Sequence, residues 1–407
     1  MLTENKRRTN PYYYAVWIAL IMLVLCFDSI YAQVSSSKQS PWEGRAVFRD
    51  KGCIECHTVY GRDEKDGPDL GRRKFYGTHL ELAALMWNHF PKMFKKMQKA
   101  GFRFKEFDEE EMAKLLAYFS FIRYIGEPGS ERKGRKLLES KGCRKCHKFG
   151  GVGGDIAPEI GTKNEYLSPL RMVETMWNHG PNMLELFEEN DIKRPQFKGN
   201  EIVDLAVAIR SYMSTSKVPV GSFDIGDPGK GKTLAGEKGC MRCHSFRGIG
   251  GELAPDFDDV DLSYSVTQIA GKMWNHGPEM WKIMKSEDIP IPVFEEGQMA
   301  DVIAYLYALK IEDAPGDLEM GSKIVGDRGC LSCHSVRGHG ADISADLATM
   351  GELNSPQAMI TAMWNHAPAM REEHLEKKLK WPEFNGIDMA NLYAYLRSLG
   401  PSAEEQK

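Results

Sequence analysis

The sequence predicts an all-α protein made of four tandem repeats that follow an apolar N-terminal leader or anchor helix. Three observations lead to this prediction. Apolar residues recur at helical spacing without any strand pattern, a set of landmark residues returns four times, and Cys-x-x-Cys-His occurs once in each repeat. We therefore divide the chain into residues 1–40, 41–126, 127–217, 218–312 and 313–407, and name the last four ranges the first to fourth copies.

The landmarks keep the same spacing in every copy. A glycine lies nine residues before the first cysteine, and a Ser or Thr lies 21 residues after the motif histidine. Met-Trp-Asn-His ends 32 residues after that histidine, and a phenylalanine lies 50 residues after it. We expect one helix that runs into the motif, a second that begins at the Ser or Thr N-cap and ends near Trp-Asn-His before a proline, and a third after the phenylalanine.

The repeated cysteine motif has a chemical reason. Two thiols one helical turn apart can add to the two vinyl groups of a haem, and the next residue presents an imidazole to the iron. A zinc site would pair two such units, and a thioredoxin-like redox pair would lie in a βαβ pattern, so neither fits. We predict four covalently attached haem c groups, held by Cys53, Cys56, His57, Cys143, Cys146, His147, Cys240, Cys243, His244, Cys330, Cys333 and His334.

The N-terminus predicts export. Three basic residues, 6–8, precede an apolar run over residues 12–27, and a possible cleavage site follows Ala32. A cleaved signal peptide and a membrane anchor both fit this pattern, because the run is about as short as a spanning helix can be. Haem attachment to both thiols takes place outside the bacterial cytoplasm, so we expect a periplasmic or otherwise exported protein. The ninth cysteine, Cys26, lies inside the apolar run.

The copies resemble class I cytochromes c over residues 41–400. The Gly-Pro-x-Leu loop of that family is matched at residues 67–70, and its C-terminal helix at residues 301–306. The resemblance implies that the carbonyl of the loop proline accepts the ring N–H of the proximal histidine. In the fourth copy Ala345 stands where this proline is expected.

The sixth iron ligand has two candidates. The family often uses a methionine three residues before the phenylalanine, but those positions here are Phe104, Arg194, Ile291 and Trp381. We favour the methionines that follow a proline after Trp-Asn-His, because that proline predicts a helix break and a turn from which a thioether can bind iron: Met93, Met183, Met280 and Met370. The alternative ligands are His89, His179, His276 and His366. The resemblance also implies that the indole N–H groups donate to a haem propionate from Trp87, Trp177, Trp274 and Trp364.

These features predict an electron carrier rather than an enzyme. Each iron would cycle between ferric and ferrous, and short linkers would let electrons pass along the chain between redox partner proteins. A membrane respiratory complex is a possible setting, since the leader can anchor the chain. The alternative is a haem enzyme, such as a peroxidase or a small-molecule reductase, with one open iron site. The net charge of −4, with both signs interspersed, does not indicate nucleic-acid binding.

Overall fold

The computed structural model describes residues 41–61, 65–73, 77–162, 167–213, 225–261, 264–349 and 353–400. The leader or anchor expected over residues 1–40, with its apolar run and Cys26, lies outside the described residues. Among the helices that are described, none is both long and apolar enough to span a lipid bilayer.

Each copy opens with a helix that packs against the last helix of the same copy. The opening helices are α2 (Pro41–Asp50), α6 (Glu131–Ser140), α10 (Pro228–Glu237) and α13 (Leu318–Asp327). The last helices are α5 (Glu109–Ile125), α9 (Glu201–Arg210), α12 (Gln298–Ile311) and α15 (Gly386–Leu399). The landmark glycine marks the crossing: a Cβ would lie 2.0, 1.9, 2.0 or 2.2 Å from a backbone oxygen of the last helix at Gly44, Gly134, Gly231 or Gly321. Only glycine allows two helix backbones to approach this closely.

The Cys-x-x-Cys segment forms a turn of its own. These turns are α3 (Cys53–Cys56), α7 (Cys143–Cys146), and the 3-10 turns η1 (Cys240–Arg242) and η2 (Cys330–Ser332). The prediction of one helix running into the motif is therefore wrong. A glycine before the first cysteine ends the opening helix, because its φ is 83°, 78°, 79° or 77° in the four copies, a left-handed conformation that glycine adopts readily.

Within the described residues, a small β-ribbon follows the motif histidine in the second, third and fourth copies. The antiparallel pairs are β1 (Lys148–Phe149) with β2 (Val152–Gly153), β3 (Ser245–Phe246) with β4 (Ile249–Gly250), and β5 (Ser335–Val336) with β6 (His339–Gly340). The expected absence of strands is wrong in this detail, because strands of two residues are too short to show a period. In the fourth copy a further 3-10 turn, η3 (Leu347–Thr349), follows the ribbon.

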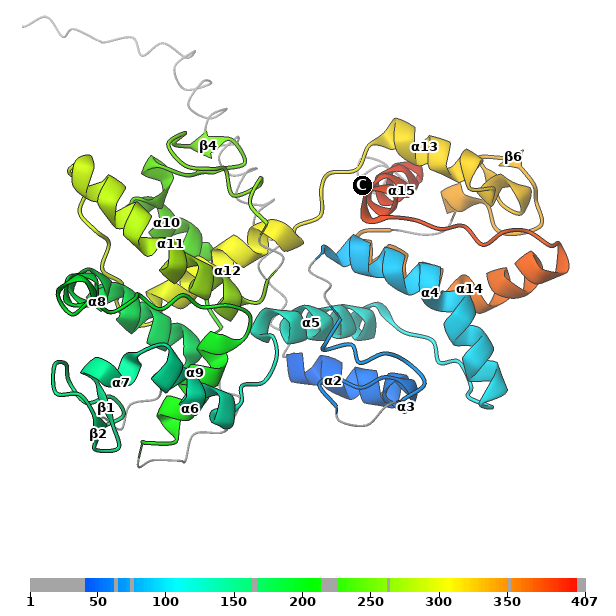
Figure 1. Ribbon diagram of the computed structural model, residues 1–407. Coiled ribbons are helices and arrows are strands. Elements are labelled where there is room, and N and C mark those ends of the chain that lie inside the picture. Colours follow the sequence, from blue (N-terminus) through cyan, green and yellow to red (C-terminus); the bar gives the residue numbers. More distant parts are fainter. Residues whose placement is uncertain are drawn as a thin grey trace, which may run out of the picture.

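A long helix forms the middle of each copy: α4 (His79–Lys99), α8 (Pro169–Glu189), α11 (Val266–Ser286) and α14 (Pro356–Glu376). The predicted N-caps are present, as at Ser168, whose side chain accepts the Arg171 N–H. The predicted break is wrong, because each helix continues through its proline, and Figure 1 shows α4 bending without ending. A proline inside a helix removes one hydrogen bond, so one carbonyl four residues earlier needs another donor.

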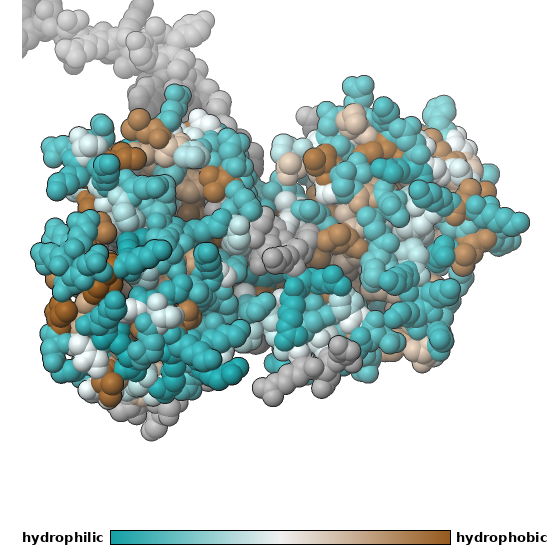
Figure 2. All heavy atoms as spheres, in the orientation of Figure 1, coloured by the Kyte–Doolittle hydropathy of each residue, from teal (hydrophilic) through white to brown (hydrophobic). Residues whose placement is uncertain are grey.

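The copies do not pack in chain order. The first and fourth copies share one hydrophobic cluster and the second and third share another, so we name them the outer pair and the inner pair. Figure 1 shows the inner pair, α6 to α12, as one lobe, and the outer pair, α2 to α5 with α13 to α15, as the other. The two lobes meet where the Tyr124 and Tyr307 rings lie 5.1 Å apart. Polar side chains cover most of the face in Figure 2, as expected when the apolar faces are buried inside the pairs.

Two glycines of α10 allow a test of the helix crossing. Gly231→Ala should lower the free energy of unfolding by about 1–3 kcal/mol, because the new Cβ would meet the Asp301 carbonyl of α12. Gly236→Ala should raise it by up to about 1 kcal/mol, because that position has no neighbour within 4 Å and alanine favours helix. Denaturant unfolding of both variants measures the difference. Equal effects of the two substitutions would contradict the crossing.

Candidate haem sites

The motif histidine is held by the same hydrogen bond in all four copies. Its Nδ1 donates to a loop carbonyl 11 residues later, over 3.0 Å from His57 to Pro68 and 2.8 Å from His147 to Pro158. The corresponding distances are 3.0 Å from His244 to Pro255 and 2.8 Å from His334 to Ala345. The expected acceptor is confirmed, and alanine provides it in the fourth copy as proline does elsewhere. This bond fixes the ring and leaves Nε2 for a metal.

An aspartate directly after that carbonyl holds the loop in place in three copies. Asp256 accepts hydrogen bonds from Ser245 Oγ at 2.7 Å and from the Gly248 N–H at 2.7 Å. Backbone N–H donors lower the pKa of Asp256 to about 2, and they do the same for Asp346. In the second copy Glu159 accepts the Gly151 N–H instead. We did not predict this role, because one acidic residue in a loop has no distinguishing pattern in the sequence.

The eight motif cysteines are free thiols. Burial raises the pKa of Cys53, Cys143 and Cys330 to about 11, which disfavours the thiolate that a redox pair requires. Within the described ranges, no group of three or more His, Cys, Asp or Glu residues is placed to hold a metal ion. Two free thiols beside one oriented imidazole therefore fit covalent haem attachment better than a structural zinc site, which needs four protein ligands.

The long helix presents both candidate sixth ligands. In the fourth copy the His366 ring lies 5.9 Å from the ring of the motif histidine, His334, measured between centroids. Met370 lies four residues after His366, on the same helix face. The methionine is therefore not in a turn past a break, as the proline led us to expect. The candidate histidine is exposed in the second, third and fourth copies, whereas the candidate methionine is half-buried there.

The asparagine of Trp-Asn-His joins each copy to its pair. Its side-chain amide donates to the carbonyl of a phenylalanine in the paired copy and accepts the N–H of the same residue, at distances of 2.7–3.0 Å. We call this pair of hydrogen bonds the asparagine clasp. It occurs four times: Asn88 with Phe384, Asn365 with Phe107, Asn178 with Phe294, and Asn275 with Phe197. We noted these residues as landmarks but assigned no role to the asparagine.

The tryptophan beside the asparagine also contacts the paired copy. The indole N–H donates to a proline carbonyl, from Trp87 to Pro382 at 2.8 Å, from Trp177 to Pro292 at 2.9 Å, and from Trp274 to Pro195 at 2.9 Å. The expectation that these three donate to a haem propionate is therefore wrong in this structure. The indole nitrogen of Trp364 is buried without a hydrogen-bond partner among the described residues.

Two carbonyls freed by the helix prolines find donors in the paired copy. The Trp87 carbonyl, four residues before Pro91, accepts the indole N–H of Trp381 at 3.2 Å. The Trp274 carbonyl, four residues before Pro278, accepts the Arg194 guanidinium. Trp381 and Arg194 lie three residues before the landmark phenylalanine, at the position where class I cytochromes c often have their ligand methionine. The paired copy thus replaces the hydrogen bond that the proline removes.

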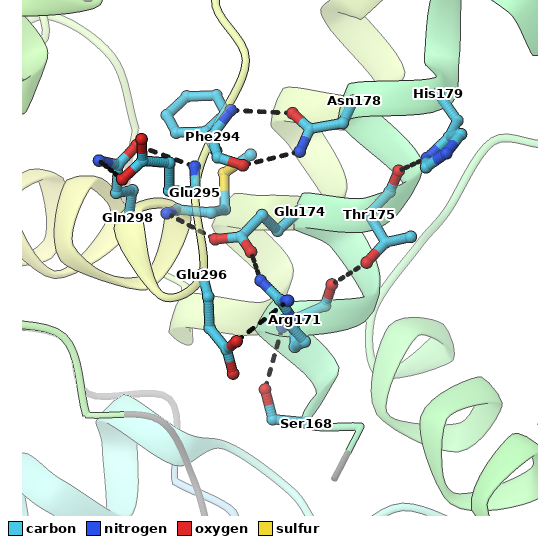
Figure 3. A network of polar contacts seen from close by, with 11 residues as sticks. Ser168, Arg171, Glu174, Thr175, Asn178, His179, Phe294, Glu295, Glu296 and Gln298 are labelled. Carbon is cyan, nitrogen blue, oxygen red and sulfur yellow. Dashed lines mark hydrogen bonds and ion pairs between the residues drawn. The ribbon is translucent and has the colours of Figure 1, made fainter. Parts of the chain in front are cut away.

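A buried carboxylate joins α8 to the start of α12 in the inner pair. Glu174, with a side chain only 2% exposed, binds Arg171 and accepts the Met299 N–H at 3.1 Å. Figure 3 shows this contact beside the clasp between Asn178 and Phe294. Burial raises the pKa of Glu174 above its usual range, but the α12 amide and the guanidinium favour its charged form. No sequence pattern marked Glu174, since the other copies carry Ala, Gly or Thr there.

Two ranges of the chain are similar to a known protein family. The family model for cytochrome c matches residues 42–120 and 229–310, which lie in the first and third copies. These two ranges are therefore similar to cytochrome c, and together they cover less than half of the chain. No curated protein matches the chain, and no solved structure does.

The asparagine clasp can be tested within α8. Asn178→Ala should lower the free energy of unfolding by about 2–4 kcal/mol, because it leaves the Phe294 N–H and carbonyl without partners. Asn182→Ala, an exposed substitution one turn later, should change it by less than about 0.5 kcal/mol. Denaturant unfolding measures both, and hydrogen exchange should show faster exchange at the Phe294 amide in Asn178→Ala alone. Unchanged protection of that amide would contradict the clasp.

Proposed function

We propose that the chain is an exported tetrahaem c-type cytochrome that carries electrons between redox partner proteins. One observation supports four haem groups rather than two. The second and fourth copies lie outside the residues that match the family, yet their motif histidines make the same Nδ1 bond to a loop carbonyl as those of the first and third copies. Four equal arrangements of two thiols and one imidazole support four haem c groups, one in each of four cytochrome c-like domains.

The residues that would hold each haem follow from these arrangements. The two cysteines of each motif would form the thioether bonds, and the motif histidine would be the proximal ligand through Nε2. Haem iron supplies one-electron chemistry by changing between ferric and ferrous states. The chain itself orients each imidazole through the bond from Nδ1 to the loop carbonyl.

We assign the sixth ligand to the methionine of the long helix. Met183, Met280 and Met370 pack against the cores of their pairs. A half-buried thioether can bind iron with little loss of solvation, because sulphur is weakly hydrated and soft. The family's usual methionine position is unavailable here, because Arg194 and Trp381 contact the paired copy instead.

The packing supports a nested route for electrons rather than transfer in chain order. The first copy packs against the fourth and the second against the third, so exchange would be fastest inside each pair. Transfer between the pairs would pass near Tyr124 and Tyr307, where the two lobes meet. The same proposal includes an export signal or membrane anchor over residues 12–27. It also includes a setting in a membrane respiratory complex.

Haem content tests the proposal. The mass of the mature protein should exceed that of its polypeptide by four haem c groups, one for each motif. Replacing both Cys143 and Cys146 by alanine should remove a quarter of the bound haem, while Cys26→Ala, outside the motifs, should remove none. Intact mass and haem absorbance in alkaline pyridine measure this. A colourless protein would overturn the function, and a mass with only two haems would limit it to the matched copies.

The ligand assignment has its own test. Met183→Ala should weaken the long-wavelength absorption band of ferric iron bound to methionine sulphur by about a quarter, and should open one site to carbon monoxide in the reduced protein. His179→Ala, one turn earlier on the same helix, should leave the band at full strength and no site open. If the band persists after all four candidate methionines are replaced, or falls in His179→Ala, the methionine assignment is wrong.

A further inference from the structure

Arg194 inserts a charged side chain between the second and third copies. Its guanidinium donates to the Trp274 carbonyl and, over 3.4 Å, to the Asn275 carbonyl of α11. The same group lies 4.2 Å from the Trp274 ring centroid and 5.9 Å from that of Trp281. Two carbonyls and two aromatic faces therefore surround the cation. Its Nε is buried without a hydrogen-bond partner among the described residues.

This charge has no counter-ion in the part of the chain that the structure describes. None of the ion pairs among the described residues involves Arg194. Burial lowers the pKa of Arg194 to about 10, which still leaves the guanidinium protonated at neutral pH. An unpaired cation at a partly desolvated interface acts over a longer distance than an exposed one, because solvent screens it less.

The charge is not needed to form the interface. The equivalent positions in the other three copies are Phe104, Ile291 and Trp381, all uncharged. In the outer pair the Trp381 indole N–H donates to the Trp87 carbonyl, the counterpart of the Trp274 carbonyl. A neutral donor therefore satisfies the same proline-freed carbonyl. The sequence places a cation in one pair only, at a position where an indole serves the other.

The contacts of Arg194 place its charge next to the candidate haem site of the third copy. Trp274 and Asn275, whose carbonyls bind it, directly precede His276 on α11, and Met280 lies one turn further along the same helix. Both candidate sixth ligands of the third copy therefore lie on the helix that Arg194 contacts. In the first copy the Trp87 carbonyl of the matching helix, α4, accepts the neutral indole N–H of Trp381 instead.

We propose that Arg194 is a residue of the second copy that raises the midpoint potential of the haem site in the third copy. The inference rests on the proposed function. A haem site carries one unit less positive charge when it is reduced, so a fixed nearby cation favours the reduced state. The third copy therefore holds electrons more tightly than it would without this cation.

Three variants separate charge from structure. Arg194→Trp installs the residue that the fourth copy carries at this position, which keeps a donor for the Trp274 carbonyl and removes the charge. Arg194→Lys keeps the charge and alters the shape. Lys193→Ala removes an exposed charge from the neighbouring residue. Spectroscopic redox titration of each full-length haem-loaded protein, at matched haem content, gives the four midpoint potentials.

We expect Arg194→Trp to lower one midpoint potential and to leave the other three unchanged. Arg194→Lys should retain most of the wild-type value, and Lys193→Ala should match the wild type. Four unchanged potentials in Arg194→Trp would overturn the inference while leaving the tetrahaem proposal intact. An equal fall in Arg194→Lys would also overturn it, because a structural disturbance rather than charge would then be responsible. A protein without covalent haem would instead overturn the proposed function.

A variant that lacks the haem of the third copy shows which copy the shifted potential belongs to. Replacing Cys240 and Cys243 by alanine should remove the haem of the third copy and leave three potentials. In that protein Arg194→Trp should shift none of the three. A remaining shift would show that the charge acts on another copy and would overturn the assignment to the third.

Discussion

The structure depends on the asparagine clasp, a pair of hydrogen bonds between one side-chain amide and one backbone residue. An asparagine amide offers a donor and an acceptor side by side, which match the carbonyl and N–H of a single residue. Each asparagine therefore forms hydrogen bonds to both the backbone N–H and the backbone carbonyl of a phenylalanine in another copy. A neighbouring β-strand would bind the same two backbone groups. Because both members of a pair carry the same clasp residues, the contact is reciprocal, and every pair is closed by two clasps.

The clasp explains how two of the long helices, α4 and α11, tolerate a proline. A proline in a helix frees a carbonyl, and burying that carbonyl without a donor costs free energy. The clasp brings the segment before each phenylalanine against the Trp-Asn-His turn, so a side chain from that segment can reach the carbonyl. Arg194 and Trp381 do so, one with a charge and one without. Pairing, helix continuity and the charge difference between the two pairs thus arise from one interface.

Sequence reasoning predicted the features that depend on local chemistry. The N-cap at Ser168, the third helix of each copy and the carbonyl partner of His57 all lie within short stretches of chain whose residues determine them. It failed where a distant partner decided the outcome. Pro91 predicted a helix end because its missing N–H normally leaves a carbonyl exposed, and the donor that repairs this loss lies in the fourth copy. The tryptophan N–H was likewise expected to donate to the cofactor, but Trp177 donates to Pro292.

By itself, the sequence determined that the chain contains four like units and where each presents two thiols and an imidazole, because these depend on residue type and spacing. Only the tertiary structure decided which unit pairs with which. The clasps join residues far apart in the chain, such as Asn88 and Phe384, and all four copies carry the same clasp residues. Identical local patterns make every pairing of copies look equally favourable, so the choice comes from packing between whole surfaces, which no local pattern contains.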